Sequence, residues 1–164
     1  MDRAQDMNAV DSLLAAAITL RPATADDRDF AWSVYADGIR PYMRAYMAWD
    51  DTDQAARFGR IYDHRHSAIV LHGDSPAGWL TVVGHDTTIL LQQFFIAAAY
   101  RGHGIGSHLL AGLCAEWDGM DRPVSLAVLK NNPAQRLYQR FGFRTYWQNA
   151  DRHFMLRPPG NPAA

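Results

Sequence analysis

A glycine-rich segment between a predicted strand and a predicted helix constrains this chain more than any other feature. Residues 101–106 read Arg-Gly-His-Gly-Ile-Gly, and the apolar run at 89–96 before them is typical of a buried strand. After them, apolar side chains recur at four-residue steps on one helical face, at Ile105, Leu109, Leu113 and Trp117. A helix N-terminus that is entered through glycines offers backbone N–H groups and partial positive charge to a phosphate. The segment therefore indicates a nucleotide-like ligand that carries phosphate, with a plain glycine-rich turn as the alternative.

Two well-known phosphate-binding motifs do not fit this segment. A dinucleotide fingerprint needs G-x-G-x-x-G and an acidic residue about 20 positions further on. Here the third glycine position is Ser107, and the next apolar strand, 124–129, ends at Lys130. A Walker loop needs Gly-Lys-Ser/Thr, but Gly106 is followed directly by Ser107. Both motifs are excluded by their spacing.

A second motif lies at 130–143, which reads Lys-Asn-Asn-Pro-Ala-Gln-Arg-Leu-Tyr-Gln-Arg-Phe-Gly-Phe. Asn132 is a favourable N-cap and Pro133 suits the first helical position. We expect this helix to end near Phe141, with Gly142 in the left-handed conformation after it. One face of the predicted helix collects Ala134, Leu137, Tyr138 and Phe141.

Together the two motifs resemble those of the GNAT superfamily of acetyl-CoA-dependent N-acetyltransferases. Residues 101–106 match the family's Q/R-x-x-G-x-G/A pyrophosphate loop, and 132–143 match its later motif with the tyrosine in the usual place. The resemblance extends over roughly residues 18–157. It implies an α/β fold with a mixed, mostly antiparallel central sheet and helices on both faces. It also implies acetyl-CoA as the co-substrate.

The same resemblance suggests the domain organisation. We expect a loose N-terminal extension at 1–16, a single N-acetyltransferase domain at 17–157 and a C-terminal tail at 158–164. A helix capped by Thr24 should follow the first strand, and a second helical region is predicted at 40–49 and 53–62. The remaining strands are expected at 67–72, 77–85, 89–96 and 124–129, with a closing antiparallel pair at 143–147 and 153–156.

Composition limits the partners and the compartment. The 164 residues have a net charge of −1, which gives no reason to expect nucleic acid or a membrane surface as a partner. The single cysteine, Cys114, excludes an internal disulfide and fits a reducing cytoplasm. Its place in the predicted helix favours a buried small side chain over a nucleophile. The seven histidines show no spacing that suggests a metal site. A homodimer is compatible with the resemblance.

The cofactor site is assigned by resemblance. In the family the pantetheine arm lies along a splayed strand and pairs with its backbone, while the glycine loop holds the pyrophosphate. The residues of this chain that take these places are Phe94, Phe95, Ile96, Arg101, Gly102, His103, Gly104, Ile105, Gly106 and Ser107. Asn131 and Asn132 both lie near the position of the family's asparagine. Of the two asparagines, Asn132 is favoured because it precedes Pro-Ala.

Tyr138 is the predicted catalytic residue. A phenol stays protonated at neutral pH and is able to donate a proton to a leaving thiolate. The alternative is an ordinary aromatic residue on a buried helix face. The Asn-Pro-Ala sequence upstream and the glycine loop together favour the role of general acid.

No general base is evident in the sequence. The strand at 89–96 carries no carboxylate, and the only glutamate, Glu116, falls late in the predicted glycine-loop helix. His72 and His85 lie near the ends of predicted strands, where each is a candidate base or an ordinary surface residue. We therefore expect ordered water to carry the proton away from the amine.

The acceptor pocket is expected in the helices after the first strand. We predict that Tyr42, Trp49 and Asp50 line it, with the indole as an apolar or cation–π wall and the carboxylate holding an ammonium. The alternative is that the aromatic residues belong to the core and the charges to a solvated face.

Three functions follow. The first is transfer of an acetyl group from acetyl-CoA to a primary amine of a small molecule, by direct attack with Tyr138 as general acid. The second is N-acetylation of a protein or peptide, and the third is non-catalytic binding of acyl-CoA.

Overall fold

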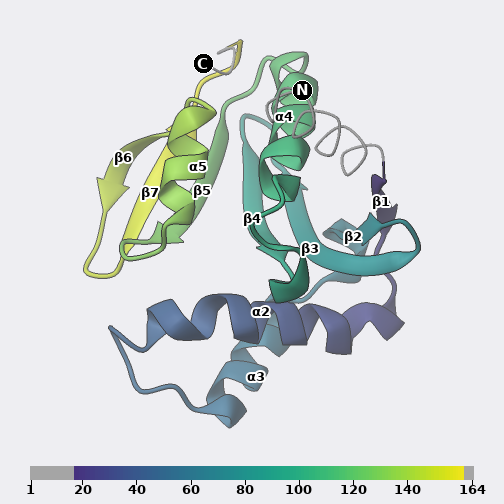
Figure 1. Cartoon of the computed structure of the whole chain (residues 1–164). Coiled ribbons are helices and arrows are strands. Elements are labelled where there is room, and N and C mark those ends of the chain that lie inside the picture. Colours follow the sequence, from purple (N-terminus) through teal and green to yellow (C-terminus); the bar gives the residue numbers. More distant parts are fainter. Residues whose placement is uncertain (1–16, 161–164) are drawn as a thin grey trace, which may run out of the picture.

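The computed structural model describes residues 17–160 as one seven-stranded sheet with helices on both faces (Figure 1). The predicted extension at 1–16 and residues 161–164 of the predicted tail lie outside the described residues. The strand order is β1-β2-β3-β4-β5-β7-β6, and β4 and β5 are the only parallel neighbours in this described sheet. The predicted α/β fold with a mixed, mostly antiparallel sheet is confirmed.

The strands are β1 (Ile18–Pro22), β2 (Ser67–His72), β3 (Ser75–Gly84), β4 (Ile89–Ile96), β5 (Val124–Leu129), β6 (Arg144–Gln148) and β7 (Arg152–Arg157). The α-helices are α2 (Arg28–Met43), α3 (Asp51–Ile61), α4 (Ile105–Asp118) and α5 (Ala134–Arg140). Short 3-10 turns stand at Ala25–Asp27, His64–His66 and Ala98–Tyr100. The strand bounds from β2 onward differ from the expected ones by no more than two residues at either end.

The first long helix extends further than the sequence suggested. Thr24 and Asp27 form the capping box that opens the helical segment, as predicted for Thr24. However, α2 continues through Pro41 to Met43, so the prediction that a second helical region begins at residue 40 is wrong. The proline ring holds a helical φ and removes only one hydrogen bond, so the helix passes through it.

The two ends of α5 agree closely with the predicted caps. The N-cap is Pro133 and the helix begins at Ala134, each one residue later than expected, while the Asn132 side chain accepts a hydrogen bond from the Ala134 N–H at 2.9 Å. Gly142 has φ 88° and is left-handed, as predicted.

Two core clusters show which helices cover which face of the sheet. On one face α4 and α5 pack against β4, β5 and β7, through Leu110, Cys114, Trp117, Tyr138, Leu91, Leu126 and Met155. On the other face α2 and α3 pack against β2 and β3, through Ala31, Val34, Tyr35, Phe58, Ile69 and Trp79. Cys114 is therefore a buried core residue, in agreement with the sequence.

The sheet opens between β4 and β5. The two strands pair only at Ile89 with Val124 and at Leu90 with Ser125, and then diverge toward α2 (Figure 1). A β-bulge shifts the register of β4 against β3 between Thr81 and Val82, which changes the direction of β4 just past the last residue paired with β5. The edge of β4 beyond Leu90 thus faces an opening.

Gly78 is needed where β3 passes the end of β4. A Cβ atom at Gly78 would overlap the carbonyl oxygen of Phe95, and backbone atoms do not move aside easily. We expect Gly78→Ala to lower the free energy of unfolding by about 1–3 kcal/mol, the usual cost of overpacking. Gly84→Ala in the same strand is the control, because nothing lies within 4 Å of its Cβ position. Urea denaturation of both variants tests this, and equal stabilities would contradict it.

None of the helices within residues 17–160 combines the length and the apolar character that crossing a membrane requires. Of the predicted tail, residues 158–160 are described, and the Gly160 N–H donates to Asp118 Oδ1 at 3.1 Å.

Candidate active site

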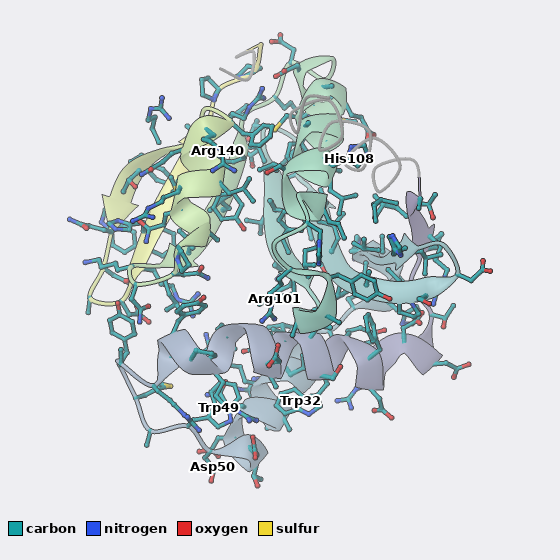
Figure 2. All side chains as sticks on the ribbon, viewed as in Figure 1. Trp32, Trp49, Asp50, Arg101, His108 and Arg140 are labelled. Carbon is teal, nitrogen blue, oxygen red and sulfur yellow. The ribbon has the colours of Figure 1, made fainter. Side chains whose placement is uncertain are left out.

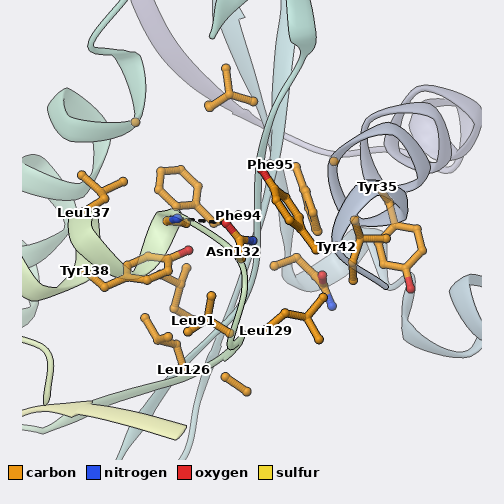
Figure 3. Close-up of a pocket in the computed structure, with 18 of the residues that line it drawn as sticks. Tyr35, Tyr42, Leu91, Phe94, Phe95, Leu126, Leu129, Asn132, Leu137 and Tyr138 are labelled. Carbon is orange, nitrogen blue, oxygen red and sulfur yellow. Dashed lines mark hydrogen bonds between the residues drawn. The ribbon is translucent and has the colours of Figure 1, made fainter. Parts of the chain in front are cut away.

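A cavity of about 420 Å³ lies where β4 and β5 separate (Figure 3). It takes its walls from both faces of the sheet. On the α4 and α5 face the walls include Phe94, Gly106, Asn132, Leu137 and Tyr138. On the α2 and α3 face they include Tyr35, Asp37, Ile39, Tyr42, Arg57, Ile61, Phe95, Leu129 and Arg152. The cavity therefore connects the two sides of the sheet through the gap.

The glycine loop leads into α4 at one wall of this cavity. Gly102 and Gly104 have φ 77° and 76°, a left-handed conformation that glycine adopts without strain. The first hydrogen bond of α4 joins the His108 N–H to the Gly104 carbonyl at 2.9 Å. The three N–H groups of residues 105–107 therefore have no partner among the described residues. No atom lies within 4 Å of a Cβ placed at either glycine, so a phosphate group can approach these donors.

Arg101 fixes the loop in place. Its Nε donates to the Ile96 carbonyl at 2.8 Å and its guanidinium pairs with Asp37 at 2.8 Å. One side chain thus ties the loop to the end of β4 and to α2. Arg101 lines the cavity as expected, but its charge is already engaged by Asp37.

The other predicted cofactor-binding residues separate into two groups. Phe94, Phe95, Ile96, Gly106 and Asn132 line the cavity. Five more residues of the loop do not: Gly102, His103, Gly104, Ile105 and Ser107. Ile105 is buried in the core, so its contribution is limited to its backbone N–H. The hydroxyl of Ser107 accepts a hydrogen bond from Arg140 of α5 at 3.3 Å, which places an arginine that was not predicted from the sequence beside the start of α4.

The two asparagines before α5 have different surroundings. Asn132 lines the cavity, and its side chain accepts a hydrogen bond from the first residue of α5. Asn131 lies outside the cavity, and its side-chain amide donates to the Tyr42 carbonyl at 3.1 Å. This bond connects the loop after β5 to the last turn of α2. The preference for Asn132 over Asn131 agrees with this arrangement.

Tyr138 lies on α5 with its hydroxyl directed toward the gap between the strands (Figure 3). The side chain is only 8% exposed, and its ring packs edge-on against Phe143 at 5.8 Å. No described residue forms a hydrogen bond with the hydroxyl. Burial raises the pKa of Tyr138 well above its usual value, so the phenol stays protonated. The geometry thus offers a neutral proton donor at the edge of the cavity.

Of the three predicted acceptor residues, only Tyr42 lines the cavity. Trp49 and Asp50 lie on the other side of α2 from Arg101 in the view of Figure 2. The Asp50 carboxylate accepts from the Asp53 N–H at 2.9 Å and caps α3, while the Trp49 indole donates to Asp51 at 2.7 Å. Because α2 continues to Met43, these residues fall in the connection to α3, away from the gap. The structure therefore does not support their assignment to the acceptor pocket.

Asp50 should consequently affect stability and not substrate binding. We expect Asp50→Ala to cost about 1 kcal/mol of folding free energy, the usual effect of losing an N-cap. Asp50→Asn keeps a capping side chain and should be close to neutral. Thermal unfolding with acceptor kinetics checks both statements. A raised KM for the acceptor in Asp50→Asn would restore the original assignment.

None of the candidate bases from the sequence lines the cavity. His72 packs against Tyr100, His85 lies in the turn after β3, and Glu116 is exposed late in α4. Asp37 is the only acidic residue that the described part of the chain contributes to the walls. The described residues contain no group of three or more histidine, cysteine, aspartate or glutamate side chains able to hold a metal.

Three further residues line the cavity without having been predicted from the sequence: Asp37, Arg57 and Arg152. A signal for Arg57 was available, because it shares one face of α3 with Gln54, Phe58 and Ile61. No local pattern marks Arg152, which reaches the site through the pairing of β7 with β5.

Comparison with known families gives a direct match. A family model described as an acetyltransferase (GNAT) domain matches residues 45–145 of this chain. That segment includes the glycine loop, both diverging strands and the helix that carries Tyr138.

Solved structures agree with the fold. The PaiA N-acetyltransferase of Thermoplasma acidophilum, in complex with coenzyme A, is 12% identical with a TM-score of 0.66, over 86% of this chain and 98% of that one. An acetyltransferase of Thermus thermophilus is 21% identical with a TM-score of 0.66, over 86% and 96%. A ribosomal-protein alanine N-acetyltransferase of Escherichia coli is 19% identical with a TM-score of 0.58, over 90% and 96%.

Proposed function

This chain belongs to the GNAT acetyltransferase family, and we propose that it transfers an acetyl group from acetyl-CoA to the primary amine of a small molecule. The observation that carries this proposal is the cavity between β4 and β5. It adjoins the free N–H groups at the start of α4, runs along the unpaired edge of β4 and contains the hydroxyl end of Tyr138. These are the groups needed to hold a phosphate-bearing thioester and to protonate its sulfur.

The residues have distinct roles in this proposal. The N–H groups of residues 105–107 bind the pyrophosphate, and the open edge of β4 at Phe94–Ile96 pairs with the extended arm. Tyr138 donates its proton to the leaving thiolate. Burial disfavours a phenolate, but a thiolate released into the same apolar surroundings is disfavoured for the same reason. Water accepts the proton of the amine.

The size of the cavity supports a small acceptor. Its volume of about 420 Å³ is within the range of roughly 300–1,000 Å³ typical of small-molecule sites. The bond between Asn131 and Tyr42 also links α2 to the loop after β5, which limits the space available to a long chain.

N-acetylation of a protein or peptide is the second candidate. It is favoured by the likeness to the Escherichia coli enzyme, whose name states N-acetylation of an alanine of a ribosomal protein. That likeness extends to the fold only.

A thermal-shift assay with acetyl-CoA, followed by a panel of amines and peptides assayed for free thiol, separates these functions. The proposal expects a rise in melting temperature and thiol release with small amines. Release with peptides alone would favour the second candidate. Binding without turnover of any acceptor would indicate a non-catalytic acyl-CoA-binding protein.

A further inference from the structure

The inward face of α3 carries a cation where an apolar residue is expected. Gln54, Arg57, Phe58 and Ile61 share this face at helical spacing, and Gln54 and Phe58 are buried. Arg57 is half-buried and lines the cavity. No hydrogen bond or ion pair to its guanidinium occurs among the described residues. The described residues thus supply no anionic partner, which leaves this charge available to water or to a ligand in the cavity.

Arg152 brings a second cation to the same side of the sheet. It pairs with Leu129 across β5 and β7, so the two side chains share a face. Leu129 follows Val128, which packs in the α4 and α5 core, so Leu129 and Arg152 point to the opposite face, toward α2 and α3. The side chain is 21% exposed, and its ion pair with the adjacent Asp151 is long, at 3.7 Å.

Tyr35 lies where the positive charges of Arg57 and Arg152 are both felt. Its side chain is 2% exposed and packs against Phe58 and Phe95 in the α2 and α3 core. Burial raises the pKa of Tyr35, and the positive charges of Arg57 and Arg152 both oppose that rise. The two guanidinium groups therefore create a common region of positive potential at this end of the cavity.

The phosphates of the cofactor do not account for this positive region. The glycine loop and the start of α4 belong to the opposite face of the sheet, beside α5. Asp37, the only acidic residue that the described chain places in the walls, is held by Arg101 at 2.8 Å. The α2 and α3 side thus offers two cations and no unengaged carboxylate, which suits an anionic group and disfavours a second ammonium.

We propose that the acceptor is a small amine whose other end carries a carboxylate, which Arg57 and Arg152 bind. Arginine matches a carboxylate with two parallel N–H donors, so a pair of arginines fixes both its position and its direction. Apolar walls from Tyr35, Ile39 and Phe95 surround the carbon skeleton between the carboxylate and the amine. The amine then enters the gap from the side opposite to the cofactor. This assignment rests on the proposed acetyltransferase function and specifies its substrate class.

Matched pairs of acceptors test the assignment. Each pair shares one carbon skeleton and one amine, and ends in a carboxylate in one member and a neutral carboxamide in the other. Thiol release from acetyl-CoA gives kcat/KM for each acceptor. This value is corrected for the fraction of amine that is neutral, because a carboxylate and a carboxamide shift the pKa of the amine by different amounts. We expect the acids to be preferred by about tenfold or more, the effect of one or two hydrogen bonds between charged groups.

Variants of the two arginines test whether these residues cause the preference for acids over amides. Arg57→Gln and Arg152→Gln should each raise the KM for the acid about ten- to a hundredfold and bring the acid-to-amide ratio toward one. Arg57→Lys should retain part of the preference for the acid that Arg57→Gln loses, because lysine keeps the positive charge. Arg60→Gln is the control, since Arg60 is exposed on the same helix and lies outside the cavity. It should keep the ratio of the parent protein.

Several outcomes would overturn the assignment. Amides that react as well as acids would do so, as would an acid preference that survives both glutamine variants. Preferred turnover of aminoalkylphosphonates would reassign the site to phosphate. Loss of the acetyl-CoA thermal shift in Arg57→Gln would make Arg57 a cofactor residue. If no amine releases thiol, the proposed function fails. Calorimetric titration of acids and amides into the CoA-saturated protein then tests the anion site independently of turnover.

Discussion

Replacing Tyr138 by phenylalanine is expected to lower kcat by roughly 10²–10⁴, the usual consequence of losing a general acid. The ring keeps its packing against Phe143, so stability and acetyl-CoA affinity should remain. Steady-state kinetics with the best amine, together with the acetyl-CoA thermal shift, measure both parts. Because burial raises the pKa of Tyr138, the parent enzyme should show no loss of activity from phenol ionisation at moderately alkaline pH.

The matched control is Tyr146→Phe. Tyr146 is 63% exposed on β6 and lies outside the cavity, so loss of its hydroxyl should leave kcat unchanged. If Tyr138→Phe turns over within a factor of about three of the parent, the hydroxyl is not the proton donor and Tyr138 is a core residue.

Gly104→Val is expected to abolish the rise in melting temperature that acetyl-CoA produces. Valine at φ 76° is strained, and its branched side chain would occupy the open space before the N–H groups of α4. Strain alone would also lower the melting temperature of the ligand-free protein, so the ligand-induced shift is the quantity to compare.

Gly73→Val separates strain from ligand blocking. Gly73 has φ 58° in the turn between β2 and β3, and no atom lies within 4 Å of its Cβ position. The variant should lose stability much as Gly104→Val does, yet keep its response to acetyl-CoA. If acetyl-CoA raises the melting temperature of Gly104→Val as it does that of the parent protein, the loop is not part of the cofactor site. Stabilisation by NADH equal to that by acetyl-CoA would also contradict the proposed ligand.

The glycine loop and the start of α5 could be predicted from sequence because their signals are local. The conformation of the glycine loop depends on residues within the loop, and the start of α5 depends on Asn132 and Pro133. Each motif follows the carboxyl end of a strand, and the two strands, β4 and β5, are parallel neighbours. The structure brings Gly106 and Tyr138 to one cavity.

The residues on the α2 and α3 side of the cavity could not be predicted because their position depends on distant contacts. Asp50 has the same sequence signature whether it caps a helix or faces a substrate, and the course of α2 through Pro41 decides between the two. Arg152 enters the cavity only because β7 pairs with β5 in a register that brings it opposite Leu129. The helical spacing places Arg57 on the same face as the apolar residues of α3, but a charged residue is ordinarily assigned to the solvated face.

Because β4 and β5 separate after Leu90, the two halves of the site are built from different elements of secondary structure. The glycine loop and α5 form one half, and α2, α3 and the start of β7 form the other. If the proposed assignment holds, we expect substitutions on α3 or β7 to change which amine fits without altering the backbone proposed to receive the cofactor. In evolutionary terms, acceptor choice in a protein of this design is free to diverge while the use of acetyl-CoA stays constant.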